Sequence, residues 1–301
     1  MYLHHFGLTQ LPFNLTPDTE FFCELPSHLE AINVLLIALQ SGEGFIKITG
    51  PVGAGKTLLC RKLLNELPPP FVTAYIANPH LSAAALHQTI ADELGIQYPR
   101  NGSQNRLLAQ INQHLLAAAG QGQKTVLIID EAQAMSLETL EALRLLTNLE
   151  TEKQKLLQIV LFGQAELDQL LQKKSIRQLR QRITFSYSLK PLTREQSRDY
   201  LLHRLQVAGN SHTDLLTPLS IAALQFYSQG IPRLLNILAH KAMLAAYGKG
   251  LSRIGLRQVQ LAAQDTDATR RRWQLLGFRA VFPWLLLGCG VFAYFSSSMS
   301  L

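Results

Sequence analysis

The sequence is poor in cysteine and in charged side chains, and each shortage excludes a class of protein. It has three cysteines in 301 residues, Cys23, Cys60 and Cys289, and no Cys-x-x-Cys pair. An odd number of widely spaced cysteines argues against a disulfide scaffold or a zinc site, and it fits a reducing compartment. Charged residues make up 16% and hydrophobic residues 47%, which is typical of a globular protein rather than a disordered one.

Acidic residues are fewer than basic ones. They number 21 against 28 lysines and arginines, so the net charge is +7 and the pI is about 9.4. Such a charge suits a negatively charged partner, either nucleic acid or an anionic membrane surface. A solvated basic face without any partner accounts for the same charge, and composition does not separate these interpretations.

A glycine-rich loop between a strand-like and a helix-like segment is the strongest feature that is present. The loop GPVGAGKT follows the apolar run FIKI at 45–48 and precedes LLCRKLL at 58–64. Its backbone N–H groups and the positive end of the following helix form an anion site. Lys56 is predicted to reach the β- and γ-phosphates of a nucleotide and Thr57 to ligate Mg²⁺; the alternative is a structural turn. The residues predicted to bind nucleotide are Gly50, Pro51, Val52, Gly53, Ala54, Gly55, Lys56 and Thr57.

Two carboxylates end a later apolar run, TVLII at 125–129. The run is continuous, as in strands that are covered on both faces. In a protein with a phosphate loop, Asp130 would hold Mg²⁺ and Glu131 would accept a proton from the attacking water. Strands often end in Asp, so the pair alone is a weak signal. Its position about 75 residues after the loop indicates a functional role.

Four further polar residues are candidates for the same chemistry. Gln164 follows the run at 156–162 and could orient water or sense the γ-phosphate; the alternative is a surface glutamine. Arg180 and Arg182 precede the last strand and could reach the nucleotide of a neighbouring subunit, unless they belong to a solvated basic helix. Arg233 opens a helix, where a cation gains nothing from the helix dipole, so we expect an external phosphate partner.

The order of the segments predicts an α/β domain followed by an all-helical one. Strand-like runs alternate with amphipathic helices up to residue 190, which implies a parallel sheet with right-handed crossovers. Strand signals are absent from 194–265. The predicted segments are a lead-in at 1–41, an α/β core at 42–190, a helical lid at 191–268, and a basic linker with a membrane anchor at 269–301.

The anchor is predicted from the absence of charge at the C-terminal end. Residues 280–301 contain no charged side chain over 22 positions, enough to span a bilayer as a helix. Arg270, Arg271 and Arg272 precede the segment, so the positive-inside rule places the body of the protein in the cytoplasm. Pro283 weakens the pattern, and a buried or interfacial helix is the alternative.

Together these features resemble an AAA+ ATPase, with Walker A at 50–57, Walker B at 126–131, sensor 1 near Gln164, an arginine finger before the last strand, and sensor 2 at Arg233. The segments FGLTQLPFNLTPDTEFF, GEGFIKITG and LLTNLETEKQKLLQIVLFGQAEL are similar to one family, that of the secretion ATPase ExeA or general secretion pathway protein A. Within it they look like the branch that serves MSHA (type IV) pilus biogenesis. The resemblance covers about residues 1–265.

The resemblance implies a P-loop fold with strand order 5-1-4-3-2, an adenine pocket between lead-in and lid, and a homo-oligomeric ring or dimer. It implies ATP and Mg²⁺ as cofactors, with metal-binding groups on Thr57 and Asp130. It also implies a bacterial inner-membrane protein whose partners assemble a type IV pilus or a type II secretion apparatus. The implied catalytic set is Lys56, Glu131, Gln164, Arg180, Arg182 and Arg233.

One departure and two competing hypotheses accompany this resemblance. ExeA-type relatives carry a periplasmic peptidoglycan-binding domain after the membrane segment, whereas this sequence stops at Leu301, so we expect a partner to supply wall binding. A DNA-handling AAA+ protein, such as a transposition regulator or helicase loader, fits the basic pI. It does not fit the anchor or the lack of a recognisable DNA-reading element, so we do not expect a nucleic-acid partner. A non-hydrolysing nucleotide switch is the third possibility.

Overall fold

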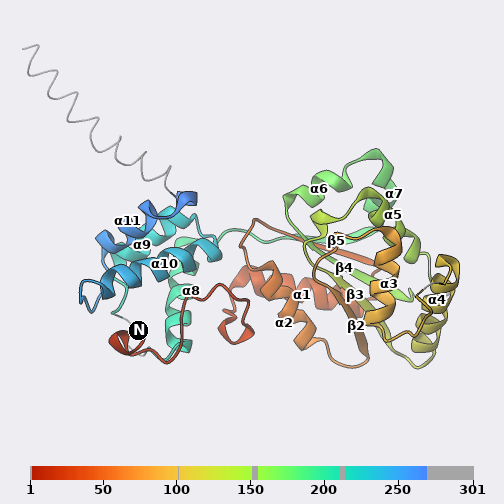
Figure 1. Cartoon of the computed structure of the whole chain (residues 1–301), viewed down its shortest axis with the longest axis horizontal. Coiled ribbons are helices and arrows are strands. Elements are labelled where there is room, and N and C mark those ends of the chain that lie inside the picture. Colours follow the sequence, from red (N-terminus) through yellow and green to blue (C-terminus); the bar gives the residue numbers. More distant parts are fainter. Residues whose placement is uncertain (1, 101, 151–154, 211–213, 270–301) are drawn as a thin grey trace, which may run out of the picture. The chain divides into compact units, whose positions relative to one another are not determined.

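The computed structural model describes residues 2–100, 102–150, 155–210 and 214–269 of the chain. They form two units (Figure 1). The sheet unit is continuous, from Thr16 to Pro191. The helical unit combines the first 15 residues with the chain from Leu192 onward.

The sheet unit is built on five parallel strands in the order β2-β3-β4-β1-β5. This is the predicted order 5-1-4-3-2 counted from the other edge, so that prediction is confirmed. The apolar runs at 45–48, 125–129 and 156–162 are confirmed as strands, with ends that differ by at most one residue. The strands are β1 (Phe45–Thr49), β2 (Phe71–Ile76), β3 (Lys124–Ile129), β4 (Leu157–Gly163) and β5 (Ile183–Ser188).

Helices cover both faces of this sheet because successive strand residues point to opposite sides. In β3, Val126 and Ile128 pack into one apolar core, and Leu127 and Ile129 into the other. The first core holds α1 (Pro26–Gln40) and α2 (Lys56–Glu66). The second lies under the remaining helices of the unit, α3 (Ala83–Glu93), α4 (Gln104–Gly120), α5 (Leu137–Leu146), α6 (Ala165–Leu171) and α7 (Arg177–Arg182). The continuous apolar run of β3 is therefore covered by helices on both faces, as predicted.

Hydroxyl side chains fix the starts of several helices. Ser136 accepts a hydrogen bond from the backbone N–H of Thr139 at 3.0 Å and caps α5. Ser82 and Ser103 do the same for α3 and α4. Cys60 is fully buried in α2, and burial raises the pKa of its thiol.

The helical unit contains α8 (Arg194–Val207), α9 (Pro218–Ser228), α10 (Pro232–Tyr247) and α11 (Leu256–Gln264). These confirm the helices expected after residue 191. The first residues of the chain pack here as well. The N–H of Thr9 donates to the Ala208 carbonyl at 2.8 Å, and the Asn210 side-chain amide donates to the Phe6 carbonyl at 3.0 Å. The expected lead-in at 1–41 is thus divided between the two units.

A glycine turn sets the start of α10. Gly230 has a φ of 72°, and its carbonyl accepts from the Leu192 N–H at 2.8 Å. A Cβ at this position would lie 2.0 Å from the Leu192 carbonyl oxygen, so no other residue fits without moving the backbone. Pro232 then begins the helix, where its fixed φ is favourable.

Among the described residues, none of the helices combines the length and the apolar character that crossing a bilayer requires. The predicted membrane segment, residues 280–301, lies outside the described part of the chain.

Candidate nucleotide site

The predicted phosphate loop connects β1 to α2 and requires glycine at three positions. Gly53 and Gly55 have φ values of 79° and 97°, which favour glycine. A Cβ on Gly50 would lie 2.9 Å from the Leu189 Cβ. The backbone can therefore turn sharply at the end of β1, and α2 begins at Lys56 with its N–H groups at the loop. This is the strand, loop and helix arrangement expected of an anion site.

Lys56 is buried and folds back over the loop. Its Nζ donates to the carbonyls of Gly50 at 2.9 Å and Pro51 at 3.0 Å. Burial lowers the pKa of Lys56, and the carboxylates of Glu131 and Asp130 act against that shift. An ammonium group has three donors, so the third is left for a phosphate oxygen.

Thr57 and Asp130, the two predicted magnesium ligands, are joined by a hydrogen bond. The Thr57 hydroxyl donates to Asp130 Oδ2 at 2.7 Å, and the Glu131 N–H donates to Asp130 Oδ1 at 2.9 Å. Burial raises the pKa of Asp130, while those two hydrogen bonds act in the opposite direction. Both side chains supply the oxygen ligands that Mg²⁺ prefers.

The donor set fits a metal that is shared with phosphates. Within the described ranges, no three His, Cys, Asp or Glu side chains gather to hold an ion by themselves. Mg²⁺ usually takes one or two protein ligands and keeps phosphate or water in its other positions. Thr57 and Asp130 therefore fit Mg²⁺ bound together with a nucleoside triphosphate.

Glu131 is held by two glutamine side chains. It follows β3 in a left-handed conformation with a φ of 50°. Gln164 Nε2 donates to Glu131 Oε2 at 3.0 Å, and Gln133 Nε2 donates to the same oxygen. The Gln164 N–H donates to Gln133 Oε1 at 3.0 Å, which closes the network. The carboxylate is thereby fixed through Oε2, and Oε1 is left to accept a proton.

Sequence reasoning found Gln164 but missed Gln133. Gln133 lies two residues after Glu131 in the short 3-10 turn Ala132–Ala134. Its only sequence signal was closeness to the acidic pair. The structure shows that it links the ends of β3 and β4, neighbours in the sheet.

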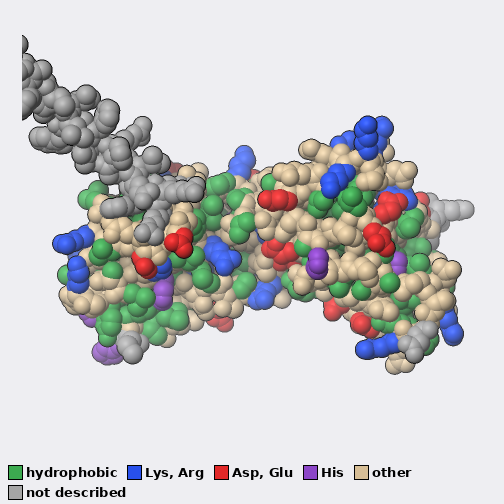
Figure 2. All heavy atoms as spheres, turned by 45° about the horizontal axis from the view of Figure 1, so that its top comes forward, with side chains coloured by type: hydrophobic (Ala, Val, Ile, Leu, Met, Phe, Trp, Pro, Cys, Tyr) green, Lys and Arg blue, Asp and Glu red, His purple; other side chains and the backbone are tan. Residues whose placement is uncertain are grey.

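The two candidate finger arginines differ in their surroundings. Arg182 Nη1 donates to the Arg144 carbonyl at 3.2 Å and to Thr147 Oγ1 at 2.5 Å, and its Nη2 donates to Asn148 Oδ1 at 2.5 Å. It therefore holds the end of α5. Arg180 is exposed on α7. Figure 2 shows Lys and Arg side chains projecting from the side of the sheet unit that carries α6 and α7 in Figure 1.

The structure thus brings together five of the predicted residues: Lys56, Thr57, Asp130, Glu131 and Gln164. Among the described residues, neither Arg180 nor Arg182 joins their hydrogen-bond network. Arg233 lies in the helical unit, exposed at the second residue of α10.

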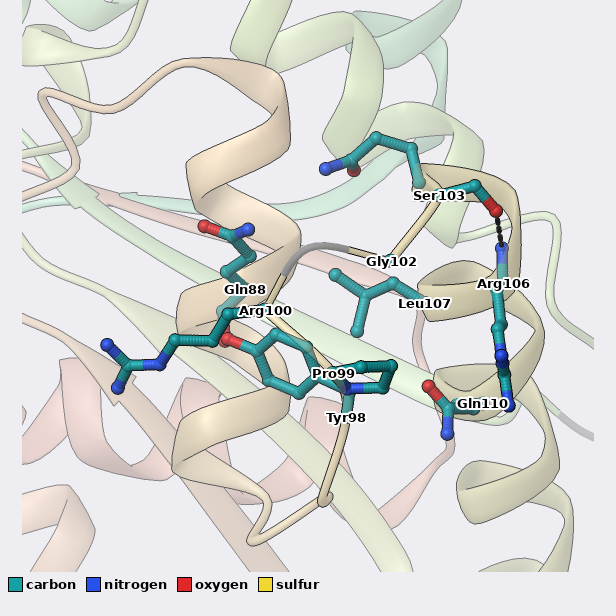
Figure 3. Close-up of a pocket in the computed structure, with 10 residues that line it drawn as sticks. Gln88, Tyr98, Pro99, Arg100, Gly102, Ser103, Arg106, Leu107 and Gln110 are labelled. Atoms are coloured by element: carbon teal, nitrogen blue, oxygen red, sulfur yellow. Dashed lines mark hydrogen bonds between the residues drawn. The ribbon is translucent and has the colours of Figure 1, made fainter.

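A second hollow lies between α3 and α4, apart from the phosphate loop (Figure 3). Arg100 and Arg106 extend away from each other in this view, so their charges do not converge on one ligand. The Arg106 N–H donates to the Ser103 hydroxyl at 3.4 Å as part of the α4 cap. None of the residues of the phosphate loop lines this hollow, and we assign no ligand to it.

The chain is similar to one domain family and to a curated protein. The AAA domain family matches residues 39–171. General secretion pathway protein A from Aeromonas hydrophila is 41% identical over 276 residues, which is 91% of this chain and 50% of that protein. The chain therefore spans half the length of this curated relative.

Several solved structures share this fold. Cdc6p from Pyrobaculum aerophilum has a TM-score of 0.65 at 22% identity, over 84% of this chain and 70% of that one. The ORC2 protein of Aeropyrum pernix has a TM-score of 0.62 at 18% identity, over 87% and 73%. The RuvB branch migration motor of Thermotoga maritima has a TM-score of 0.53 at 17% identity, over 79% and 67%. At these identities the likeness shows the P-loop NTPase fold alone.

Proposed function

Because the chain belongs with the AAA+ ATPases related to General secretion pathway protein A, we propose that it hydrolyses ATP with Mg²⁺ to drive assembly of a type IV pilus or a type II secretion apparatus. The observation that carries the ATPase proposal is the Thr57–Asp130 hydrogen bond, 2.7 Å long. It unites the two halves of a magnesium site beside the buried Lys56 and next to a held carboxylate on Glu131.

The residues of the chain suit catalysis by positioning and electrostatics. Lys56 and the loop N–H groups bind the phosphates, and Thr57 and Asp130 hold the metal. When bound, Mg²⁺ neutralises charge on the phosphate oxygens. Glu131 accepts the proton of the attacking water on Oε1, while Gln133 and Gln164 hold the other carboxylate oxygen. Arg233 would sense the nucleotide from the helical unit.

Measuring Mg²⁺-dependent ATP hydrolysis by the purified chain, with and without DNA, tests this proposal against its alternative. We expect turnover that DNA does not raise. The DNA-handling hypothesis has two observations in its favour, the basic pI and the fold shared with an ORC1 protein solved in complex with DNA. It predicts turnover that DNA stimulates with a steep dependence on salt. ATP binding without turnover in the assembled state would instead favour the nucleotide switch.

We propose that Arg180 of one subunit stabilises the charge that develops on the nucleotide of a neighbouring subunit. Because Arg182 is already bonded to the end of α5, Arg180 is the arginine that is free to project to a neighbour. Mixing Arg180→Ala subunits with Glu131→Gln subunits should restore part of the activity that each lacks alone, because a neighbour's arginine can complete a site that retains Glu131. The rate of ATP hydrolysis in the mixture measures this.

Arg182→Ala is the matched variant for that experiment. It should lower the thermal midpoint by a few degrees, since three hydrogen bonds to the end of α5 are lost, and it should keep its activity. Complementation by Arg182→Ala, with none by Arg180→Ala, would reverse the assignment.

Membrane attachment and pathway form the finer part of the proposal. We propose that residues 269–301 anchor the protein in the bacterial inner membrane with its body in the cytoplasm. The uncharged stretch and its preceding arginines support this, and fractionation with and without residues 274–301 tests it. The pathway we favour is MSHA-type pilus biogenesis, the role of an MshM-type ATPase. Loss of the gene should then abolish pili and leave type II secretion intact.

A further inference from the structure

A buried histidine of α1 contacts the backbone of the phosphate loop. His28 lies in the first turn of α1, with 5% of its surface exposed. The Phe22 ring packs edge-on to it, with centroids 6.1 Å apart. On its other side His28 Nε2 lies 3.1 Å from the carbonyl oxygen of Ala54. Helix α1 thus supplies a polar group to a loop that is 26 residues away in the chain.

The chemistry of this contact fixes the state of the imidazole. A carbonyl oxygen only accepts, so Nε2 must carry the proton, and in a neutral imidazole Nδ1 is then an acceptor. The Ser27 hydroxyl lies 3.5 Å from Nδ1, where it can donate. Burial lowers the pKa of His28. The neutral form with its proton on Nε2 therefore donates a hydrogen bond to the Ala54 carbonyl and places no charge between α1 and the loop.

This hydrogen bond also controls the next N–H group of the loop. In a planar trans peptide the C=O and N–H groups point in opposite directions. Holding the Ala54 oxygen toward α1 therefore turns the Gly55 N–H away from α1. The same imidazole restricts residue 55 itself, because a Cβ there would lie 3.0 Å from His28 Nε2.

We propose that His28 is a positioning residue for nucleotide binding, which holds the Ala54–Gly55 peptide so that the Gly55 N–H faces a phosphate oxygen. The inference rests on the proposed binding of ATP by this loop. In this proposal α1 contributes to ligand affinity and also covers one face of the sheet. The chemical groups assigned to hydrolysis are untouched by it, so the effect belongs in affinity and not in the chemical step.

A pair of polar substitutions tests this directly. A Gln amide can reach the position of the imidazole Nε2, whereas the shorter Asn side chain cannot. His28→Asn should therefore raise the Kd for ATP and the KM about tenfold, the effect of one lost hydrogen bond to a buried carbonyl. His28→Gln should stay within about threefold of the unaltered protein, and kcat should be similar in all three. Calorimetric titration with ATP in Mg²⁺ buffer and steady-state kinetics give these values.

His87 offers a matched control. It is a buried histidine of the same unit, on α3 and 8% exposed, and its Nδ1 lies 3.4 Å from Gln104 Oε1. His87→Asn should affect thermal stability and leave the Kd for ATP unchanged. If His28→Asn and His28→Gln both bind ATP as tightly as the unaltered protein, or both lose affinity equally, the inference is wrong. If the unaltered protein itself fails to bind ATP, the proposed function is wrong instead.

Discussion

Replacing Glu131 with Gln should leave ATP bound and stop its hydrolysis. Gln has the same size and keeps an oxygen to accept from Gln133 and Gln164, so the position of the side chain is retained. It cannot accept a proton from water. We expect kcat to fall by about 10²- to 10⁴-fold, the usual contribution of a general base, while the Kd for ATP changes little. Single-turnover hydrolysis and calorimetric titration measure the two quantities separately.

Glu138→Gln is the control for this substitution. Glu138 is exposed in the first turn of α5, so removing its charge should change neither kcat nor Kd. Replacing Gln133 with Leu removes one of the two donors to Glu131 Oε2 and should give an intermediate loss of kcat. Hydrolysis at the normal rate by the Glu131→Gln protein would show that a different group activates the water.

Replacing Lys56 with Ala should remove ATP binding. The substitution deletes the buried ammonium group that faces the phosphates and leaves the Gly50 and Pro51 carbonyls without their donor. A hydrogen bond from a charged group contributes about 1.5–3 kcal/mol. Because the attraction between the ammonium group and the charged triphosphate is lost as well, affinity should fall at least about 100-fold. Titration with ATP in Mg²⁺ buffer measures the change.

Lys62→Ala tests whether any lysine of α2 has this effect. Lys62 forms a partly exposed ion pair with Glu66 at 3.0 Å on the same helix, and such pairs contribute little to stability. Its loss should leave ATP affinity unchanged. Normal affinity in the Lys56→Ala protein would mean that the loop does not bind nucleotide through this side chain.

The sequence was sufficient to predict the strands and the core of the site, because both depend on local pattern. An apolar run between a helix and a glycine loop, as at β1, has few alternatives. Likewise, Thr57 lies in the first turn of the helix that follows the β1 loop, and Asp130 directly follows β3. The carboxyl ends of parallel strands meet at one edge of a sheet. The strand order itself came from the family resemblance and not from periodicity.

The contacts that were missed are those between residues distant in the chain. His28 looks like any polar residue of an amphipathic helix until α1 packs against the loop. Gln133 and Gln164 are 31 residues apart and meet only because β3 and β4 are neighbours. Arg180 and Arg182 could not be separated by sequence, since only the position of α5 shows that Arg182 is engaged.

The division of the N-terminal segment between two units has a consequence for biosynthesis. The first 15 residues leave the ribosome first, yet the groups they bind, such as the Ala208 carbonyl and the Asn210 amide, are made about 200 residues later. The stretch from Thr16 to Pro191 is complete well before that and can fold as a domain during translation. The first 15 residues therefore cannot form these two hydrogen bonds until α8 has emerged, and chaperones that bind nascent chains would meet their apolar residues, among them Tyr2 and Phe6.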